Sequence, residues 1–213
     1  GGLIAGCAIA AKDIAPDIDI VGIETVMYPS MHTGLFGETG RLTDGVSIAD
    51  GISVKWPGTL TLPIAKKLVF RIDLVWEEDI ETAIHLFAQI EKRMVEGAGA
   101  TGLGAVLAFP EAYAGKRIAL VVSGGNIDTR LLSSVFMRGL VRTGRLVRLG
   151  VQISDLPGNL ARVTDMIAGL GGNIVEVEHE RWYRDVPIRM AQIEILVEVR
   201  NSGDGHSVAE GLA

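Results

Sequence analysis

The chain has 213 residues, a net charge of −6 and a hydrophobic share of 48% with only 5% aromatic residues, so it can bury a sizeable aliphatic core. An acidic chain without a basic stripe speaks against nucleic-acid binding, a single cysteine excludes an internal disulfide, and no two of the four histidines have metal-ligand spacing. No apolar run could cross a membrane and no basic stretch starts a signal peptide, so we expect a cytoplasmic protein.

The first 142 residues alternate between expected helices and strands, which predicts an α/β fold. Gly1-Gly2 lead into a helix over residues 3–14, and a glycine loop at a helix start suits a phosphate. A frayed chain end explains two glycines equally well. Residues 28–51 form a glycine-punctuated irregular stretch. The other expected elements are strand 19–23, helix 59–68, strand 70–76, a helix from Glu77 with the apolar face Ile80, Ala83, Ile84, Phe87, Ile90 and Met94, helix 100–109, and helix 129–137.

An unbroken apolar run at residues 118–122 predicts a parallel strand buried on both faces. Ser123, Gly124 and Gly125 follow it at once. Ligands of open α/β sheets bind at the carboxyl ends of strands, and glycines let the backbone approach them closely. An ordinary turn after a strand is the competing interpretation.

The segment from Gly97 to Gly102 matches the pattern G-x-G-x-x-G of dinucleotide-binding proteins. That fingerprint must follow a strand, whereas here it follows the strongest predicted helix. We therefore reject a nicotinamide oxidoreductase and expect a turn between two helices, with Glu96 at its apex.

The last third of the chain has a different pattern, beginning after a basic, glycine-punctuated linker at residues 138–145. We expect strand 146–153, a turn at 155–158, a helix marked by Leu160, Val163, Ile167 and Leu170, strands 174–180 and 190–199 around a loop at 182–187, and a helix from Ser207. This β-α-β-β-α order predicts a ferredoxin-like α+β domain without its last strand. The expected domains are residues 1–142 and 143–213.

The sequence resembles the threonine ammonia-lyases (threonine dehydratases), pyridoxal-phosphate enzymes of fold type II, in the branch with a C-terminal ACT domain. The segments that carry the resemblance are GGLIAG at the start, VGIE at 21–24, SIADGISVKWPG at 47–58, VEGAGA at 95–100, VVSGGNID at 121–128, RGLVRTGRLVRL at 138–149, DLPGNLARV at 155–163 and GGNIVEVEHER at 171–181. They cover essentially the whole chain. The resemblance implies the C-terminal part of a tryptophan synthase β-like large domain, followed by the ACT domain.

The resemblance also implies roles for single residues. Ser123 would bond the pyridine nitrogen of the cofactor, and Glu96 would lie beside the ring. The other implied cofactor contacts are Gly1, Gly2 and Gly124; Asp50 and Gly51 would line the substrate side, and Glu24 would help to bind a monovalent or divalent cation. An amino-acid effector would bind at Asp155, Leu156, Gly158 and Asn159, facing Asn173 and Ile174 across the sheet.

The family's Schiff-base lysine has no counterpart among the six lysines here, because none stands in a Ser-x-Lys-x-Arg-Gly-like motif. The chain also starts without methionine and stops within an expected helix. We therefore expect a fragment that is inactive alone, from an enzyme that deaminates L-threonine or L-serine in isoleucine biosynthesis or catabolism. We expect a homo-oligomer under allosteric control by a branched-chain amino acid. The alternatives are a non-catalytic amino-acid-binding and dimerisation module, or a related serine/threonine dehydratase or racemase.

Overall fold

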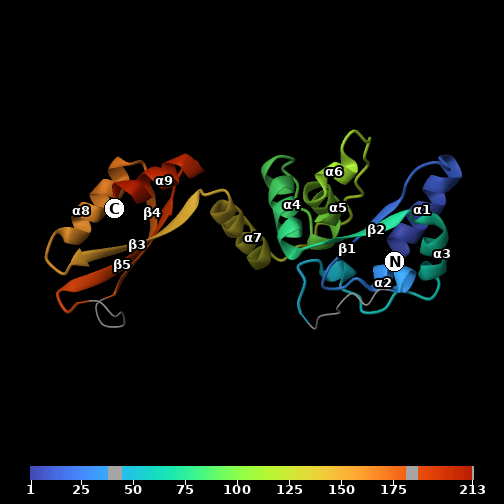
Figure 1. The fold of residues 1–213 in the computed structure, drawn as a ribbon, viewed down its shortest axis with the longest axis horizontal. Helices are drawn as coiled ribbons and strands as arrows, with labels where there is room; N and C mark the ends of the chain where they lie inside the picture. Colours follow the sequence, from blue (N-terminus) through green and yellow to red (C-terminus); the bar gives the residue numbers. More distant parts are fainter. Residues whose placement is uncertain (38–44, 181–186, 213) are drawn as a thin grey trace. The chain divides into compact units, whose positions relative to one another are not determined.

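The computed structural model describes residues 1–37, 45–180 and 187–212, which form two compact units, Gly1–Val135 and Phe136–Ala213 (Figure 1). In the described residues, no helix is long and apolar enough to cross a membrane. The predicted irregular stretch at 28–51 and loop at 182–187 lie partly outside these ranges.

The first unit is an α/β structure built on two parallel strands. Its elements are α1 (Gly2–Ile14), β1 (Val21–Thr25), α2 (Ser30–Phe36), the 3-10 helix η1 (Asp50–Ile52), α3 (Thr61–Leu68), β2 (Arg71–Val75), α4 (Glu77–Gln89), α5 (Gly97–Ala108) and α6 (Pro110–Tyr113); α7 (Thr129–Arg142) extends into the second unit. β1 and β2 pair from Val21–Arg71 to Thr25–Val75. α5 contacts both strands, α4 packs on α5, and α1 packs on α3.

The predicted apolar face of α4 is confirmed over its first three turns. Ile80, Ala83, Ile84 and Phe87 are all buried, because their spacing places them on one side of the helix. The helix ends at Gln89, earlier than predicted, so Ile90 and Met94 do not continue this face and are 65% and 62% exposed. The chain changes direction just beyond, where Lys92 adopts a left-handed backbone conformation.

The apolar run at residues 118–122 is not a strand in the structure, contrary to the prediction. Ile118, Leu120, Val121 and Val122 are 38–59% exposed. In the described part of the first unit only β1 and β2 form a sheet. A β-strand needs hydrogen-bonding neighbours, and this run has no partner strand among the described residues, so it forms no strand.

Other helices also differ from the predictions. α2 occupies part of the stretch predicted to be irregular, and α7 continues to Arg142 through most of the predicted linker. The last helix, α9 (Ser202–Gly211), starts five residues early despite Gly203 and Gly205. The side chain of Asn201 accepts a hydrogen bond from the Asp204 N–H at 3.1 Å, and this N-cap stabilises the first turn.

The second unit is a three-stranded antiparallel sheet with helices on one face. β3 (Leu146–Ser154) and β4 (Asn173–Glu180) flank β5 (Met190–Glu198), and α8 (Asn159–Gly169) joins β3 to β4. Ile193, Ile195 and Val197 alternate along β5 on the face that meets both helices. They form the core with Val163 and Ile167 of α8, Val208 of α9, and Val199, which follows β5. The predicted β-α-β-β-α order is confirmed.

Candidate functional site

Three loops of the first unit meet at the amino-terminal end of α5. Glu96 precedes this helix, and its N–H donates to the Gly124 carbonyl oxygen at 3.3 Å. The Glu96 carboxylate in turn accepts a hydrogen bond from the Asn126 N–H at 3.2 Å. The loop after residue 122 is thus attached to Glu96 through two backbone groups.

The glycines of the G-x-G-x-x-G segment allow these loops to approach α5. A Cβ on Gly97 would overlap the carbonyl oxygen of Ile48, and one on Gly99 would lie 2.6 Å from the carbonyl oxygen of Ser123. Both glycines belong to the first turn of α5, whereas the sequence predicted a turn before the helix. Glycine is needed at positions 97 and 99 because neighbouring backbone packs where a side chain would lie.

Asp50 and Gly51 reach the same place from the third loop. A Cβ on Gly51 would lie 3.2 Å from the Ala98 Cβ and 3.8 Å from Glu96 Oε1. The Asp50 carboxylate accepts a hydrogen bond from the Gly51 N–H at 2.8 Å within η1. Five predicted site residues therefore lie on loops that converge here: Asp50, Gly51, Glu96, Ser123 and Gly124.

Gly1 and Gly2 lie at the start of α1. A Cβ on Gly1 would lie 2.5 Å from Thr61 Oγ1, whereas Gly2 has open space around its Cα. The first turn of α1 carries no acidic side chain. This helix end therefore presents free N–H groups and the positive end of the helix dipole.

Glu24, the predicted cation ligand, is engaged with α2. Its carboxylate accepts hydrogen bonds from the N–H groups of Met31 and His32, each at 2.9 Å, and from the Ser30 hydroxyl at 3.3 Å. Burial raises the pKa of the Glu24 carboxyl, and these hydrogen bonds oppose the rise. No group of three or more His, Cys, Asp or Glu side chains in the described ranges could hold a metal ion.

Glu77 was not among the predicted site residues, yet its carboxylate contacts the loop that leads to Asp50. Its carboxylate accepts hydrogen bonds from the Thr25 hydroxyl, the Ser47 hydroxyl and the Ile48 N–H, each at 2.7 Å. In the sequence Glu77 is one of three acids at a helix start, and all three suit the helix dipole equally well. Only the fold distinguishes it, because it brings the loop at residues 47–51 to this carboxylate.

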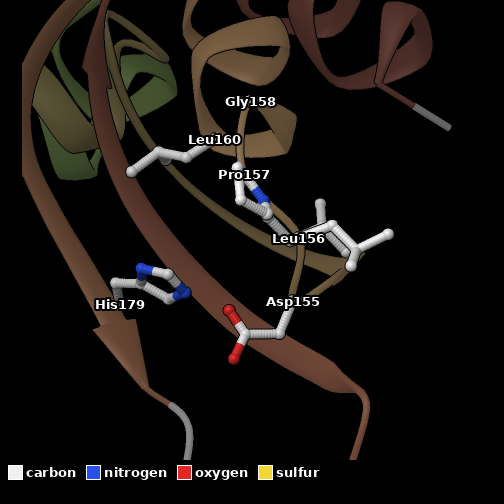
Figure 2. Close-up of a pocket in the computed structure, with 7 residues that line it drawn as sticks. Asp155, Leu156, Pro157, Gly158, Leu160 and His179 are labelled. Atoms are coloured by element: carbon white, nitrogen blue, oxygen red, sulfur yellow. The ribbon is translucent and has the colours of Figure 1, made fainter.

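The second unit has a pocket of about 410 Å³ at the loop between β3 and α8 (Figure 2). Three of the predicted effector residues, Asp155, Leu156 and Gly158, line it, and Gly158 has a left-handed backbone with φ of 91°. His179 of β4 lines it as well, and Figure 2 shows its ring on the side of Asp155. His179 was not among the predicted effector residues.

Asn173 and Ile174 do not face this loop within one chain, so that geometric expectation is wrong. Asn173 pairs with Glu198, which pairs with Leu146 at the start of β3. The loop at Asp155 follows the opposite end of β3. Because β5 is antiparallel to both neighbours, it is the end of β4, with His179, that lies at this side. Asn159, the other predicted contact, donates its side-chain amide to the Ser154 carbonyl oxygen at 2.9 Å.

The first unit is thus an α/β domain whose candidate site is made of glycine-rich loops around a helix start, the class of site that holds a phosphorylated cofactor. The family model described as pyridoxal-phosphate dependent enzyme matches residues 1–124. The chain belongs to this family, whose members use pyridoxal phosphate.

Relatives and solved structures agree with this assignment. The chain is 40% identical to an L-threonine ammonia-lyase of Thermotoga maritima, over 93% of this chain and 49% of the relative, and 42% identical to one of Geobacter sulfurreducens, over 97% and 51%. It spans about half the length of the curated relatives it matches. A processed threonine deaminase isoform from Solanum lycopersicum matches with a TM-score of 0.58 at 32% identity, over 64% of this chain and 39% of that one. Maize serine racemase matches with a TM-score of 0.56 at 32% identity, over 67% and 45%.

Proposed function

We propose that this chain is part of a pyridoxal-phosphate-dependent threonine ammonia-lyase, which converts L-threonine to 2-oxobutanoate and ammonia. The observation that carries the proposal is the meeting of Asp50-Gly51, Glu96 and Ser123-Gly124 at the start of α5. The identity to L-threonine ammonia-lyases over nearly the whole chain supports threonine as the substrate. L-Serine is the second candidate substrate, and racemisation the second candidate reaction, because a serine racemase shares the fold at 32% identity.

The described residues fit the cofactor. The Ser123 hydroxyl is half-buried and has no hydrogen-bond partner among the residues that the structure describes, so it is free to bond a ring nitrogen. Gly124, with φ of 89°, follows it without a side chain. The amino-terminal end of α1 at Gly1-Gly2 suits the phosphate group.

When bound, pyridoxal phosphate supplies the electron sink for the α-carbon of an amino acid. The Ser123 hydroxyl would donate a hydrogen bond to the ring nitrogen and, being neutral, would leave that nitrogen largely unprotonated. Glu96, whose carboxylate accepts a hydrogen bond from the Asn126 N–H, would lie beside the ring. The remaining roles would be the phosphate for Gly1 and Gly2, a further cofactor contact for Gly124, the substrate side for Asp50 and Gly51, and a cation for Glu24.

The test is Ser123→Ala in the complete protein that contains this chain, assayed for 2-oxobutanoate release. Loss of one hydrogen bond of about 1.5 kcal/mol should lower kcat at least about tenfold. The matched control is Ser133→Ala, because Ser133 is exposed on α7. Wild-type turnover in Ser123→Ala, with the cofactor bound normally, would contradict the assignment.

We further propose that residues 143–213 are an ACT domain and residues 1–142 part of the catalytic domain. The strand order β3-β5-β4 with α8 and α9 on one face supports a ferredoxin-like fold. The ammonia-lyase relatives match over 93% and 97% of this chain, which includes most of this second unit. The ACT domain would bind a branched-chain amino acid at the loop of Asp155 to Asn159, with Asn173 and Ile174 supplied by a second copy, and so regulate the enzyme.

Calorimetry with isoleucine and valine tests this second proposal. Gly158 starts α8 with a left-handed backbone, so Gly158→Ala should disturb the N–H groups that would meet the ligand carboxylate and abolish the binding heat. Gly169→Ala is the matched control, because a Cβ there meets nothing within 4 Å. Absence of heat with every branched-chain amino acid in the complete protein would count against the site.

A further inference from the structure

Glu77 is the centre of a polar network between β1, α4 and the loop at residues 47–51. The Thr25 hydroxyl and the Ser47 hydroxyl both donate to Glu77 Oε1, and the Ile48 N–H donates to Oε2. All three donor–acceptor distances are 2.7 Å, so each is a well-formed hydrogen bond. Thr25 is fully buried and Ser47 is 5% exposed, so water does not compete at either hydroxyl.

The direction of each bond is determined by the backbone. The Met27 N–H donates to the Thr25 hydroxyl oxygen at 3.3 Å, and the Ala49 N–H donates to the Ser47 hydroxyl oxygen at 3.0 Å. Each hydroxyl therefore accepts from the backbone and gives its own proton to Glu77. A group at position 77 must accept three hydrogen bonds and donate none, which a carboxylate satisfies and a carboxamide does not.

The loop is held from its other side by α5. The carbonyl oxygen of Ile48 lies where a Cβ of Gly97 would be, and the Ala49 Cα would be 2.9 Å from that Cβ. Ala49 is fully buried. The segment from Ser47 to Ala49 is thus confined between the Glu77 carboxylate and the first turn of α5, and Asp50 and Gly51 follow it directly beside Glu96.

We propose that Glu77 is a positioning residue for the active site: it fixes the loop at residues 47–51 and thereby places Asp50 and Gly51 on the substrate side of the cofactor. The role of Asp50 and Gly51 rests on the proposed function, whereas the fixing of the loop by Glu77 does not. Glu77 acts only through this loop and does not touch substrate.

Two arms of the network separate positioning from general stability. Ser47→Ala removes one of the two hydrogen bonds that join the loop to Glu77, whereas Thr25→Val removes the bond to β1 and leaves both loop bonds in place. In the complete protein, Glu77→Gln and Ser47→Ala should each raise the KM for threonine about tenfold, since a small misplacement of a contact near the substrate is costly. Thr25→Val should lower thermal stability with little change in KM. Glu78→Gln, an exposed neighbour on the same helix turn, is the control.

Amide hydrogen exchange of residues 48–51 gives a readout independent of activity. Exchange should accelerate in Glu77→Gln and Ser47→Ala and stay unchanged in Glu78→Gln. If the wild type does not deaminate threonine, the proposed function fails. The exchange result still tests whether Glu77 fixes the loop at residues 47–51. Unchanged exchange and unchanged KM in Ser47→Ala, or an equal KM rise in Thr25→Val, would overturn the inference.

Discussion

Glu96 and Gly124 are fitted to one another: the Glu96 N–H donates to the Gly124 carbonyl oxygen at 3.3 Å, and a Cβ on Gly124 would overlap the Glu96 carboxylate. The two residues are 28 positions apart in the chain, and both were predicted to touch the cofactor. Their contact makes the position of the Glu96 side chain depend on the absence of a side chain at residue 124.

Gly124→Ala should therefore lower the stability of the protein by more than the left-handed backbone conformation at this position alone would cost. The φ of 89° costs an alanine about 1–2 kcal/mol, and the new methyl group must also displace the Glu96 carboxylate. Gly115→Ala is the control, because Gly115 has φ of 73° and open space around its Cα. Urea unfolding should show a larger stability loss for Gly124→Ala, and cofactor titration of the complete protein should show weaker binding for that variant alone. Equal stability losses in Gly124→Ala and Gly115→Ala would show that the contact between residue 124 and Glu96 does not contribute to stability.

Glu24 should make stability depend on pH. Burial raises the pKa of its carboxyl above the ordinary 4.5, so the folded state holds this proton more tightly than the unfolded state. Its contribution to the free energy of unfolding is therefore largest below pH 4.5 and declines as the pH rises through the folded-state pKa. Comparison of wild type with Glu24→Gln, which does not titrate, should show the stability difference shifting in favour of Glu24→Gln as the pH rises above 4.5. A difference that does not change as the pH rises above 4.5 would contradict the pKa rise.

The Tyr113 hydroxyl should keep its proton well above pH 10.0, the ordinary pKa of tyrosine. Burial and the hydrogen bond from its hydroxyl to Asp73 Oδ2, at 2.6 Å, raise its pKa from 10.0 to about 12. The stabilisation that the protonated Tyr113 hydroxyl contributes is thus complete below pH 10 and is lost as the pH rises through about 12. Tyr113→Phe should lower the free energy of unfolding at neutral pH by about 1–2 kcal/mol. At about pH 10.5, absorbance titration should find as much phenolate in the wild type as in Tyr113→Phe; a clear excess in the wild type would show that Tyr113 titrates normally.

Residues 1–213 on their own should neither retain pyridoxal phosphate covalently nor deaminate threonine. None of the six lysines stands in a Ser-x-Lys-x-Arg-Gly-like motif, where the resemblance to threonine ammonia-lyases implies the cofactor lysine. The test is to add pyridoxal phosphate, reduce with borohydride and measure the intact mass. A stoichiometric adduct at one lysine, together with threonine-dependent release of 2-oxobutanoate, would identify a catalytic lysine outside that motif.

The sequence alone determined those elements whose pattern is local. The apolar spacing of Ile80, Ala83, Ile84 and Phe87 indicates a helix wherever it packs, because a helix brings every third or fourth side chain to one face. Alternation in residues 146–153 and 190–199 likewise predicted β3 and β5. Short motifs predicted Glu96, Ser123 and Gly124 as cofactor contacts, and this stays a prediction. The family model matches residues 1–124, the range in which these three residues lie.

Only the tertiary structure decided what depends on partners distant in the chain. The run at residues 118–122 has every local property of a buried strand, yet it is unpaired because strand formation requires neighbours that the described residues do not supply. Asn173 was expected beside Asp155, but the antiparallel register of β5 sends it to the other end of the sheet. Glu77 looked like its acidic neighbours until the fold brought two hydroxyl groups and one N–H group to its carboxylate. Hydrogen-bond partners at a sequence separation of about 30 or more leave no periodic trace in the chain, so register and networks of this kind are properties of the folded molecule.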